Sequence, residues 1–200
     1  MFAPNPRRFA LFALLALSMA ATRMNHAGSA WLPPDASWAV FYLAGFYLAR
    51  EWRWALTLLL IEAVAIDGLA IRYHGLSNYC ATLAYWFILP AYSVLWLGGA
   101  WLRRHYTQAA PDVARLCASL LLCVTLCYLL TNVSFYWLGG RIEHPDPLGW
   151  WSNFARWYPR FLMVPCMYVG FAALLHVAFT HRSHSAAPQH TRSRRRGFCR

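Results

Sequence analysis

The stretch VARLCASLLLCVTLCYLLTNVSFYWL, residues Val113–Leu138, decides the fold class. It contains a single charged residue, Arg115. It is also longer than the roughly 20 apolar residues that a helix needs to cross the hydrocarbon core of a bilayer. Because lipid offers no hydrogen-bond partners to the backbone, a spanning segment must satisfy its own N–H and C=O groups. The stretch therefore predicts a transmembrane α-helix.

Five further apolar runs accompany it, at Arg8–Ala21, Ser37–Leu48, Trp54–Ile71, Ala81–Leu102 and Phe161–Thr180. The first two are short, so they need flanking residues from Pro6 and Pro34 onward to reach across a bilayer. Pro90 and Pro165 lie inside two of the runs and predict kinks there. The series predicts an all-α integral membrane protein with six transmembrane helices.

The composition agrees with a membrane protein. Of the 200 residues, 60% are hydrophobic and 12% are charged, which is about half the usual charged share. This disfavours a soluble enzyme, since a soluble domain needs more polar surface to cover its core. The formal net charge is +11, but the 18 basic residues are all arginines that flank apolar runs or lie in the C-terminal tail, so we do not expect nucleic-acid binding.

The arginines also predict the topology. With the N-terminus in the cytoplasm, the loops that face outward hold only Arg23, Arg72, Arg141, Arg156 and Arg160, and the other arginines face inward. This bias predicts that both termini are cytoplasmic. Residues 1–180 then form the membrane domain, and residues 181–200 form an Arg-rich, disordered cytoplasmic tail that can touch anionic lipid. In the alternative interpretation, residues 1–21 are a cleaved signal peptide and five spans remain.

The three outward segments, Thr22–Ser37, Arg72–Tyr79 and Gly139–Arg160, carry the unusual residues. The last of them and its approach are rich in aromatic side chains, which by themselves form an interfacial belt in many membrane proteins. Here polar residues lie among the rings, and this favours a pocket for a large amphipathic ligand. These polar residues are Arg141, Glu143, His144, Asp146, Asn153, Arg156 and Arg160.

Asp67 lies about one helical turn from the predicted outer end of the third span. An ionisable group at this depth is costly and usually faces a cavity or a partner of opposite charge. Two interpretations remain open: a ligand-binding carboxylate, or a structural ion pair with an arginine such as Arg72 or Arg156. Glu62 lies deeper and on another face of the helix.

Cys80 lies where the fourth apolar run begins, in the sequence Ser77-Asn78-Tyr79-Cys80-Ala81-Thr82. With Ser77 or Asn78 as the N-cap, Cys80 falls in the first helical turn. The helix dipole and the free backbone N–H groups there favour the thiolate, which binds soft metal centres and attacks disulfides. A lone cysteine is otherwise often an inert core residue.

The other cysteines and the remaining motifs give no evidence of a catalytic or metal-binding site. Cys123 and Cys127 share a helix face and are expected to be buried thiols, and the sequence has neither paired zinc-ligand spacing nor a nucleotide-binding motif. The chain therefore brings no ATPase of its own.

Several aromatic-rich patches, taken in order, resemble the BtuM family of bacterial cobalamin transport proteins, which are related to the substrate-binding S-components of energy-coupling-factor transporters. The resemblance covers roughly residues 8–180. The patches that carry it are Ser37–Tyr47, Glu62-Ala63 with Ile66-Asp67, Tyr79–Tyr85, Pro90–Tyr92, Val133–Tyr136, Gly149-Trp150 and Tyr158–Leu162.

The resemblance implies an S-component-like fold in the bacterial inner membrane, with an outward-facing pocket for cobalamin. It implies that Cys80 is the catalytic cysteine, which ligates the cobalt of cobalamin and assists removal of cyanide from cyanocobalamin. The resemblance also implies a partner, an energising module of the energy-coupling-factor type. The corrinoid-binding residues that we predict are Asp67, Tyr79, Tyr85, Tyr136, Asn153 and Arg156, the last as the best match to an arginine near the start of the final helix.

The leading hypothesis is thus a cobalamin-binding transport protein of the inner membrane. The first alternative is an integral-membrane thiol oxidoreductase that uses Cys80, which would need a second cysteine within reach. The second is a structural membrane subunit, which would tolerate the loss of Cys80 and Asp67.

Overall fold

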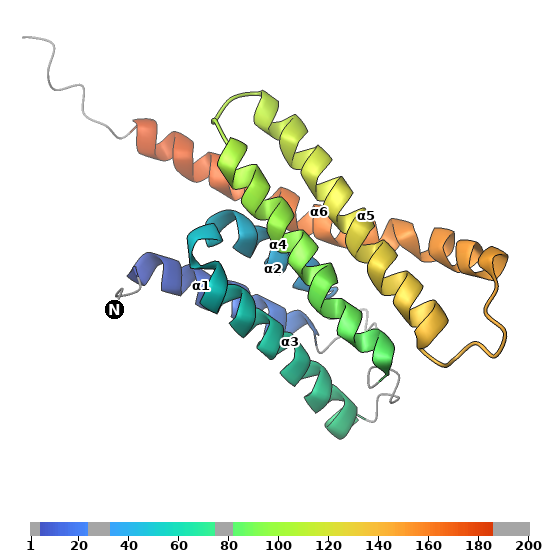
Figure 1. The fold of residues 1–200 in the computed structure, drawn as a ribbon. Helices are drawn as coiled ribbons and strands as arrows, with labels where there is room; N and C mark the ends of the chain where they lie inside the picture. Colours follow the sequence, from blue (N-terminus) through green and yellow to red (C-terminus); the bar gives the residue numbers. More distant parts are fainter. Residues whose placement is uncertain (1–4, 24–32, 75–81, 186–200) are drawn as a thin grey trace, which may run out of the picture.

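The computed structural model describes residues 5–23, 33–74 and 82–185, and Cys80, Tyr79 and the tail beyond Ser185 lie outside these ranges. The described chain is all-α and contains no strand. Its elements are α1 (Pro6–Arg23), α2 (Ser37–Tyr47), the 3-10 turn η2 (Ala49–Glu51), α3 (Trp52–His74), the 3-10 helix η4 (Leu83–Phe87), α4 (Ile88–His105), α5 (Pro111–Leu138) and α6 (Pro147–Ser185). Figure 1 shows them as one bundle crossed by the long α6.

Local sequence explains where several helices begin. Asn5 precedes α1, and its side-chain oxygen accepts a hydrogen bond from the backbone N–H of Arg7 at 3.1 Å. Pro111 opens α5, where the N–H that proline lacks would have no partner within the helix. Pro90 is the third residue of α4, so it too lies in the first turn rather than at a break within the span.

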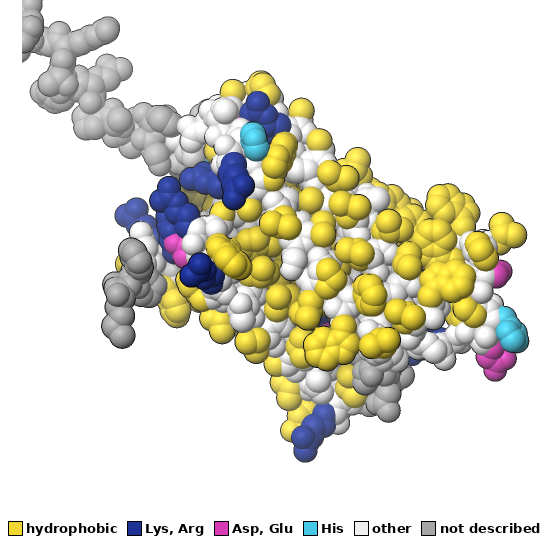
Figure 2. Space-filling view, in the orientation of Figure 1, with side chains coloured by type: hydrophobic (Ala, Val, Ile, Leu, Met, Phe, Trp, Pro, Cys, Tyr) yellow, Lys and Arg dark blue, Asp and Glu magenta, His cyan; other side chains and the backbone are white. Residues whose placement is uncertain are grey.

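Four helical segments are long and apolar enough to cross a membrane: Ala49–Tyr73, Leu83–His105, Pro111–Leu138 and Pro147–Thr180. They place large apolar side chains such as Leu97, Met163 and Leu174 on the outside of the bundle, about two-thirds exposed. On the face in Figure 2, hydrophobic side chains cover the middle of the molecule. The chain therefore has the character of a multi-pass membrane protein.

The other two predicted spans differ from this group. α1 has 18 residues and includes three arginines, while α2 has only 11 residues. At 1.5 Å per residue α2 is about 16 Å long, roughly half of the hydrocarbon thickness. Almost all of α2 is buried, and Phe41 and Ala44 are fully inaccessible. α2 is thus the central helix of the bundle, which its neighbours enclose.

Two glycines set the closest helix contact. A Cβ at Gly99 of α4 would overlap the backbone of Tyr42 in α2, and one at Gly45 of α2 would overlap the backbone of Trp96 in α4. Small residues allow helices in a membrane to approach until their backbones touch. This pair of contacts, which we call the glycine seam, holds the second half of α2 against the middle of α4.

The last helix corrects two predicted boundaries. α6 begins at Pro147, so much of the predicted outward segment Gly139–Arg160 is helical, and the helix passes through Pro159 and Pro165. It also continues to Ser185, five residues beyond the end of the sixth apolar run at Thr180. With 39 residues it is about 58 Å long, which is much more than one bilayer core requires.

Contacts define two ends of the bundle. At the end that we call the Asp67 end, the last residue of α1 contacts α3 and the starts of α2 and α4, and η4 contacts α3. At the opposite end, the His176 end, Arg8 of α1 pairs with Glu51 of η2, and His176 of α6 contacts the end of α2. In Figure 2 most basic side chains gather near the start of α1 and the turn between α4 and α5, which belong to the His176 end.

Candidate functional site at the Asp67 end

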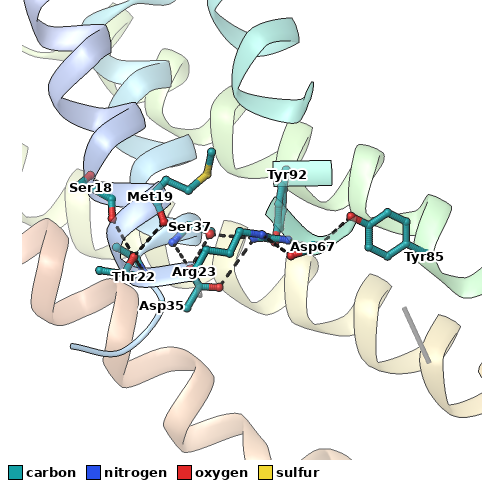
Figure 3. Close-up of polar contacts among 10 residues, drawn as sticks. Ser18, Met19, Thr22, Arg23, Asp35, Ser37, Asp67, Tyr85 and Tyr92 are labelled. Atoms are coloured by element: carbon teal, nitrogen blue, oxygen red, sulfur yellow. Dashed lines mark hydrogen bonds and ion pairs between the residues drawn. The ribbon is translucent and has the colours of Figure 1, made fainter. Parts of the chain in front are cut away.

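A buried ion pair between Arg23 and Asp67 forms the centre of the Asp67 end (Figure 3). Arg23 donates from Nε to Oδ1 of Asp67 at 2.7 Å and from Nη2 to Oδ2 at 2.6 Å. The arginine side chain is 3% exposed and the aspartate side chain 5%. Two parallel charge-assisted bonds fix both side chains in one geometry, so this pair ties the end of α1 to α3.

Other polar groups complete the arginine's surroundings. Its Nη1 donates to the hydroxyls of Ser37 at 2.8 Å and Tyr92 at 2.9 Å, and the carboxylate of Asp35 lies 3.8 Å from Nη1. Asp35 in turn accepts hydrogen bonds from the N–H and the hydroxyl of Ser37. Arg23 was not among the predicted site residues. The signal that could have identified it is its place: it directly follows an apolar run, at the depth where a membrane carboxylate needs a cation.

Tyr85 joins this network from η4. Its hydroxyl donates to Oδ2 of Asp67 at 2.8 Å. Two predicted corrinoid-binding residues, Asp67 and Tyr85, are thus in direct contact, and Figure 3 shows Tyr85 on the side of Asp67 away from Arg23. The partner of Asp67 is Arg23 and not Arg72 or Arg156, because α1 packs against α3 there. Both carboxylate oxygens already accept hydrogen bonds, so Asp67 positions Tyr85.

The predicted start of the fourth helix is wrong. Thr82 is extended, with φ −92° and ψ 167°, and it is the N-cap of the 3-10 helix that begins at Leu83. The predicted caps Ser77 and Asn78 lie outside the described residues, and the described helix takes Thr82 as its cap. Cys80 and Tyr79 themselves belong to the segment outside the described residues, which leads directly into Thr82, three positions before Tyr85.

An aromatic cluster lies beside the polar network. On α6, the ring of Phe154 stacks on Trp151 at 5.8 Å and on Tyr158 at 5.5 Å, because these residues are three and four positions apart on one helix face. Tyr128 of α5 packs on Phe154 at 4.7 Å. Trp38 of α2 lies 6.5 Å from Tyr128, and its neighbour Ser37 binds Arg23. The first turn of α2 thus joins the cluster to the ion pair.

Two buried polar atoms within this cluster have no hydrogen-bond partner among the described residues: the acceptor Oδ1 of Asn132 and the donor Nε1 of Trp150. Nδ2 of Asn132 donates to the hydroxyl of Tyr128 at 3.2 Å, and that hydroxyl donates to the carbonyl of Phe154. A buried polar atom without a partner is costly, so each atom is a candidate contact for a bound molecule.

The other predicted residues divide between α5 and α6. Tyr136 is 9% exposed. Its hydroxyl packs against Gly149 at the start of α6, so closely that a Cβ on this glycine would lie 2.6 Å from the hydroxyl oxygen. Asn153 is half-buried and Arg156 is exposed, both on the early part of α6. No contact joins these three residues to Asp67 or Tyr85 among the interactions described above.

The described residues contain no group of three or more His, Cys, Asp or Glu side chains placed to hold a metal ion. Cys123 and Cys127 are buried thiols of α5, whereas Cys117 and Cys166 are exposed. The sequence matches no protein-family model and no curated protein.

Proposed function

We propose that this protein binds cobalamin at the Asp67 end and transports it across the bacterial inner membrane, as the resemblance to the BtuM family implies. The contact between Asp67 and Tyr85 carries the proposal. It joins two residues that the resemblance assigns to the pocket, at the end of the bundle where the segment with Tyr79 and Cys80 meets Thr82. Six membrane-embedded helices and cytoplasmic termini are part of the same proposal, and the basic His176 end then faces the cytoplasm.

The chemistry of the site supports this class of ligand. Cobalamin offers a broad apolar corrin edge and many amide arms. The stacked rings of Trp151, Phe154 and Tyr158 provide an apolar surface, while Asn132 and Trp150 provide an acceptor and a donor without partners among the described residues. Because the corrin ring itself holds the cobalt, the protein needs only one axial ligand, and a cluster of metal-binding side chains is not required.

Cys80 supplies that axial ligand in our proposal, as its thiolate. Donation from sulfur weakens the bond to the opposite axial ligand, and cyanide leaves from that position as the anion. This exchange leaves the cobalt oxidation state unchanged. Reduction to Co(II) takes one electron per cobalt from a small thiol such as glutathione, and each disulfide formed accounts for two cobalt centres.

Absorbance spectra of the purified protein test the proposal. We expect wild-type protein incubated with cyanocobalamin to retain the corrinoid with a spectrum shifted from that of the free vitamin. We expect Cys80→Ala to lose the shift. Cys117→Ala is the matched control, since Cys117 is an exposed thiol near the start of α5 at the His176 end, and it should behave like the wild type.

The alternatives predict different results. Wild-type protein without bound corrinoid would contradict the proposal. A Cys80 disulfide that forms during turnover, detected by mass spectrometry, would favour a membrane thiol oxidoreductase. Normal function of Cys80→Ala and Asp67→Ala would favour a structural subunit.

A further inference from the structure

Two cavities lie at the His176 end, away from the site proposed for cobalamin. The first, about 370 Å³, lies among α2, α4, α5 and α6, and the second, about 460 Å³, lies among α1, α2 and α6. Neither is lined by Asp67 or Tyr85. The two cavities share the lining residues Leu43, Tyr47, His176 and Thr180, so they meet along one wall.

That wall carries a chain of three polar side chains. The ring of His176 lies between two tyrosines: Nδ1 is 3.0 Å from the hydroxyl of Tyr47, and Nε2 is 3.1 Å from the hydroxyl of Tyr106. All three residues line the first cavity. Phe46 packs edge-on against the histidine ring at 6.0 Å, so the group is held among aromatic side chains.

At least one of the two tyrosine hydroxyl protons has no acceptor within the group of Tyr47, His176 and Tyr106. A neutral imidazole has one N–H donor and one acceptor nitrogen. One tyrosine therefore donates to His176, and the other accepts from it and keeps its own O–H proton. In the cationic form both tyrosines keep their protons. The described residues provide no second hydrogen-bond acceptor for Tyr47 or Tyr106, so at least one hydroxyl remains to donate to a molecule in the cavity.

The turn that borders the first cavity is rigidly built. Gln108, which lines the cavity, has φ 60°, a left-handed conformation that costs a non-glycine residue energy. The buried carboxylate of Asp112 holds it there by accepting the N–H groups of Thr107 at 2.8 Å and Ala109 at 3.2 Å. This part of the cavity wall is therefore held by several hydrogen bonds before any ligand binds.

The second cavity adjoins the first at the shared wall and is mostly apolar. Apart from the shared wall it is lined by Leu11, Leu14, Leu15, Ala172, Leu175 and Phe179. Leu14 is 64% exposed and Phe179 is 65% exposed, so the cavity reaches the outer surface of the bundle between α1 and α6. In a membrane this surface faces lipid, and a hydrocarbon chain can enter from there.

We propose that the two cavities together bind an elongated membrane amphiphile. Its apolar chain lies between α1 and α6, and an oxygen of its head accepts the spare hydroxyl proton of Tyr47 or Tyr106. The guanidinium of Arg103, 5.5 Å from the Phe46 ring that borders the head, favours negative charge on that oxygen. A quinone carbonyl and a fatty acyl carboxylate share this chemistry, and the test separates them.

The test measures retention of radiolabelled decyl-ubiquinone and of radiolabelled oleate on the detergent-purified full-length protein. We expect the wild type to retain at least one of them, and which one is retained identifies the source. Ala173→Phe fills the first cavity and should weaken binding more than tenfold. Ala178→Phe makes the same change at an exposed position of α6 and should leave binding unchanged.

A double variant tests the hydrogen bond itself. Tyr47→Phe with Tyr106→Phe keeps both rings and removes both hydroxyls, so we expect affinity for the retained probe to fall about tenfold. 1-Octadecene has the hydrocarbon chain but no oxygen, so it should displace the retained probe from the wild-type protein only weakly. Retention of neither probe overturns the proposal, as does wild-type affinity in the double variant. If Ala173→Phe elutes as an aggregate on size exclusion, the double variant decides.

Discussion

The Asp67 end and the His176 end of the bundle differ in how the polar side chains that join their helices are paired. At the Asp67 end, formal charges are buried and matched: Arg23 binds Asp67 through two hydrogen bonds. At the His176 end, the ion pair between Arg8 of α1 and Glu51 of η2 is partly exposed, and a half-buried histidine lies between two half-buried tyrosines beside a cavity. The first arrangement fixes helices in place, while the second leaves hydrogen-bonding capacity for another molecule.

The largest effect that we expect comes from breaking the buried pair. Asp67→Leu leaves the Arg23 charge without its main partner and should lower the free energy of unfolding by about 3–5 kcal/mol. Thermal unfolding in detergent measures it. Arg23→Met combined with Asp67→Leu removes both charges and should recover most of the stability. Equal losses in the single and double variants would show that the charge is not what matters.

The next effect comes from widening the glycine seam, the close contact between α2 and α4. Gly99→Ala forces a Cβ into the backbone of Tyr42 and should cost about 1–3 kcal/mol of stability. Gly170→Ala is the control, because a Cβ there meets nothing within 4 Å. Both are measured by thermal unfolding. Similar stability of the two variants would mean that α2 and α4 can separate without cost.

We expect a smaller loss of stability when only the hydroxyl of Tyr85 is removed. Tyr85→Phe removes one hydrogen bond to the carboxylate of Asp67 and should cost about 1.5 kcal/mol, as well as weaken binding of cyanocobalamin. Tyr73→Phe changes an exposed tyrosine of α3 and should do neither. Titration followed by absorbance gives the affinity. Unchanged binding by Tyr85→Phe would separate this hydroxyl from the ligand.

The smallest effect belongs to the ion pair at the other end. The side chains of Arg8 and Glu51 are 37% and 19% exposed, so water screens their attraction. Glu51→Gln should cost less than about 1 kcal/mol, and added salt should reduce the difference further. Unfolding curves at low and high salt measure this. A loss as large as that of Asp67→Leu would contradict the contrast between the two ends.

The apolar runs predict most of the helices well, because their cause is local. The third, fourth, fifth and sixth runs correspond to α3, α4, α5 and the second half of α6. Two helix starts were misplaced. Thr82 is the cap of the 3-10 helix, although Ser77 and Asn78 are cap residue types too and the sequence does not decide among them. The early part of α6 is helical although its polar residues are typical of a loop. There three aromatic rings stack on one helix face, a contact that the helical spacing of their residues allows.

The sequence alone determined that this chain is helical and has the character of a membrane protein, since long apolar runs leave the backbone no other way to satisfy its hydrogen bonds in lipid. It also singled out Asp67 as a carboxylate within the membrane that faces either a ligand or an arginine. Only the tertiary structure decided that the partner is Arg23, that Tyr85 shares it, and that α2 is enclosed by the others. These outcomes depend on which helices touch. Hydropathy is visible in each local stretch of sequence, whereas the packing of side chains from distant segments is not.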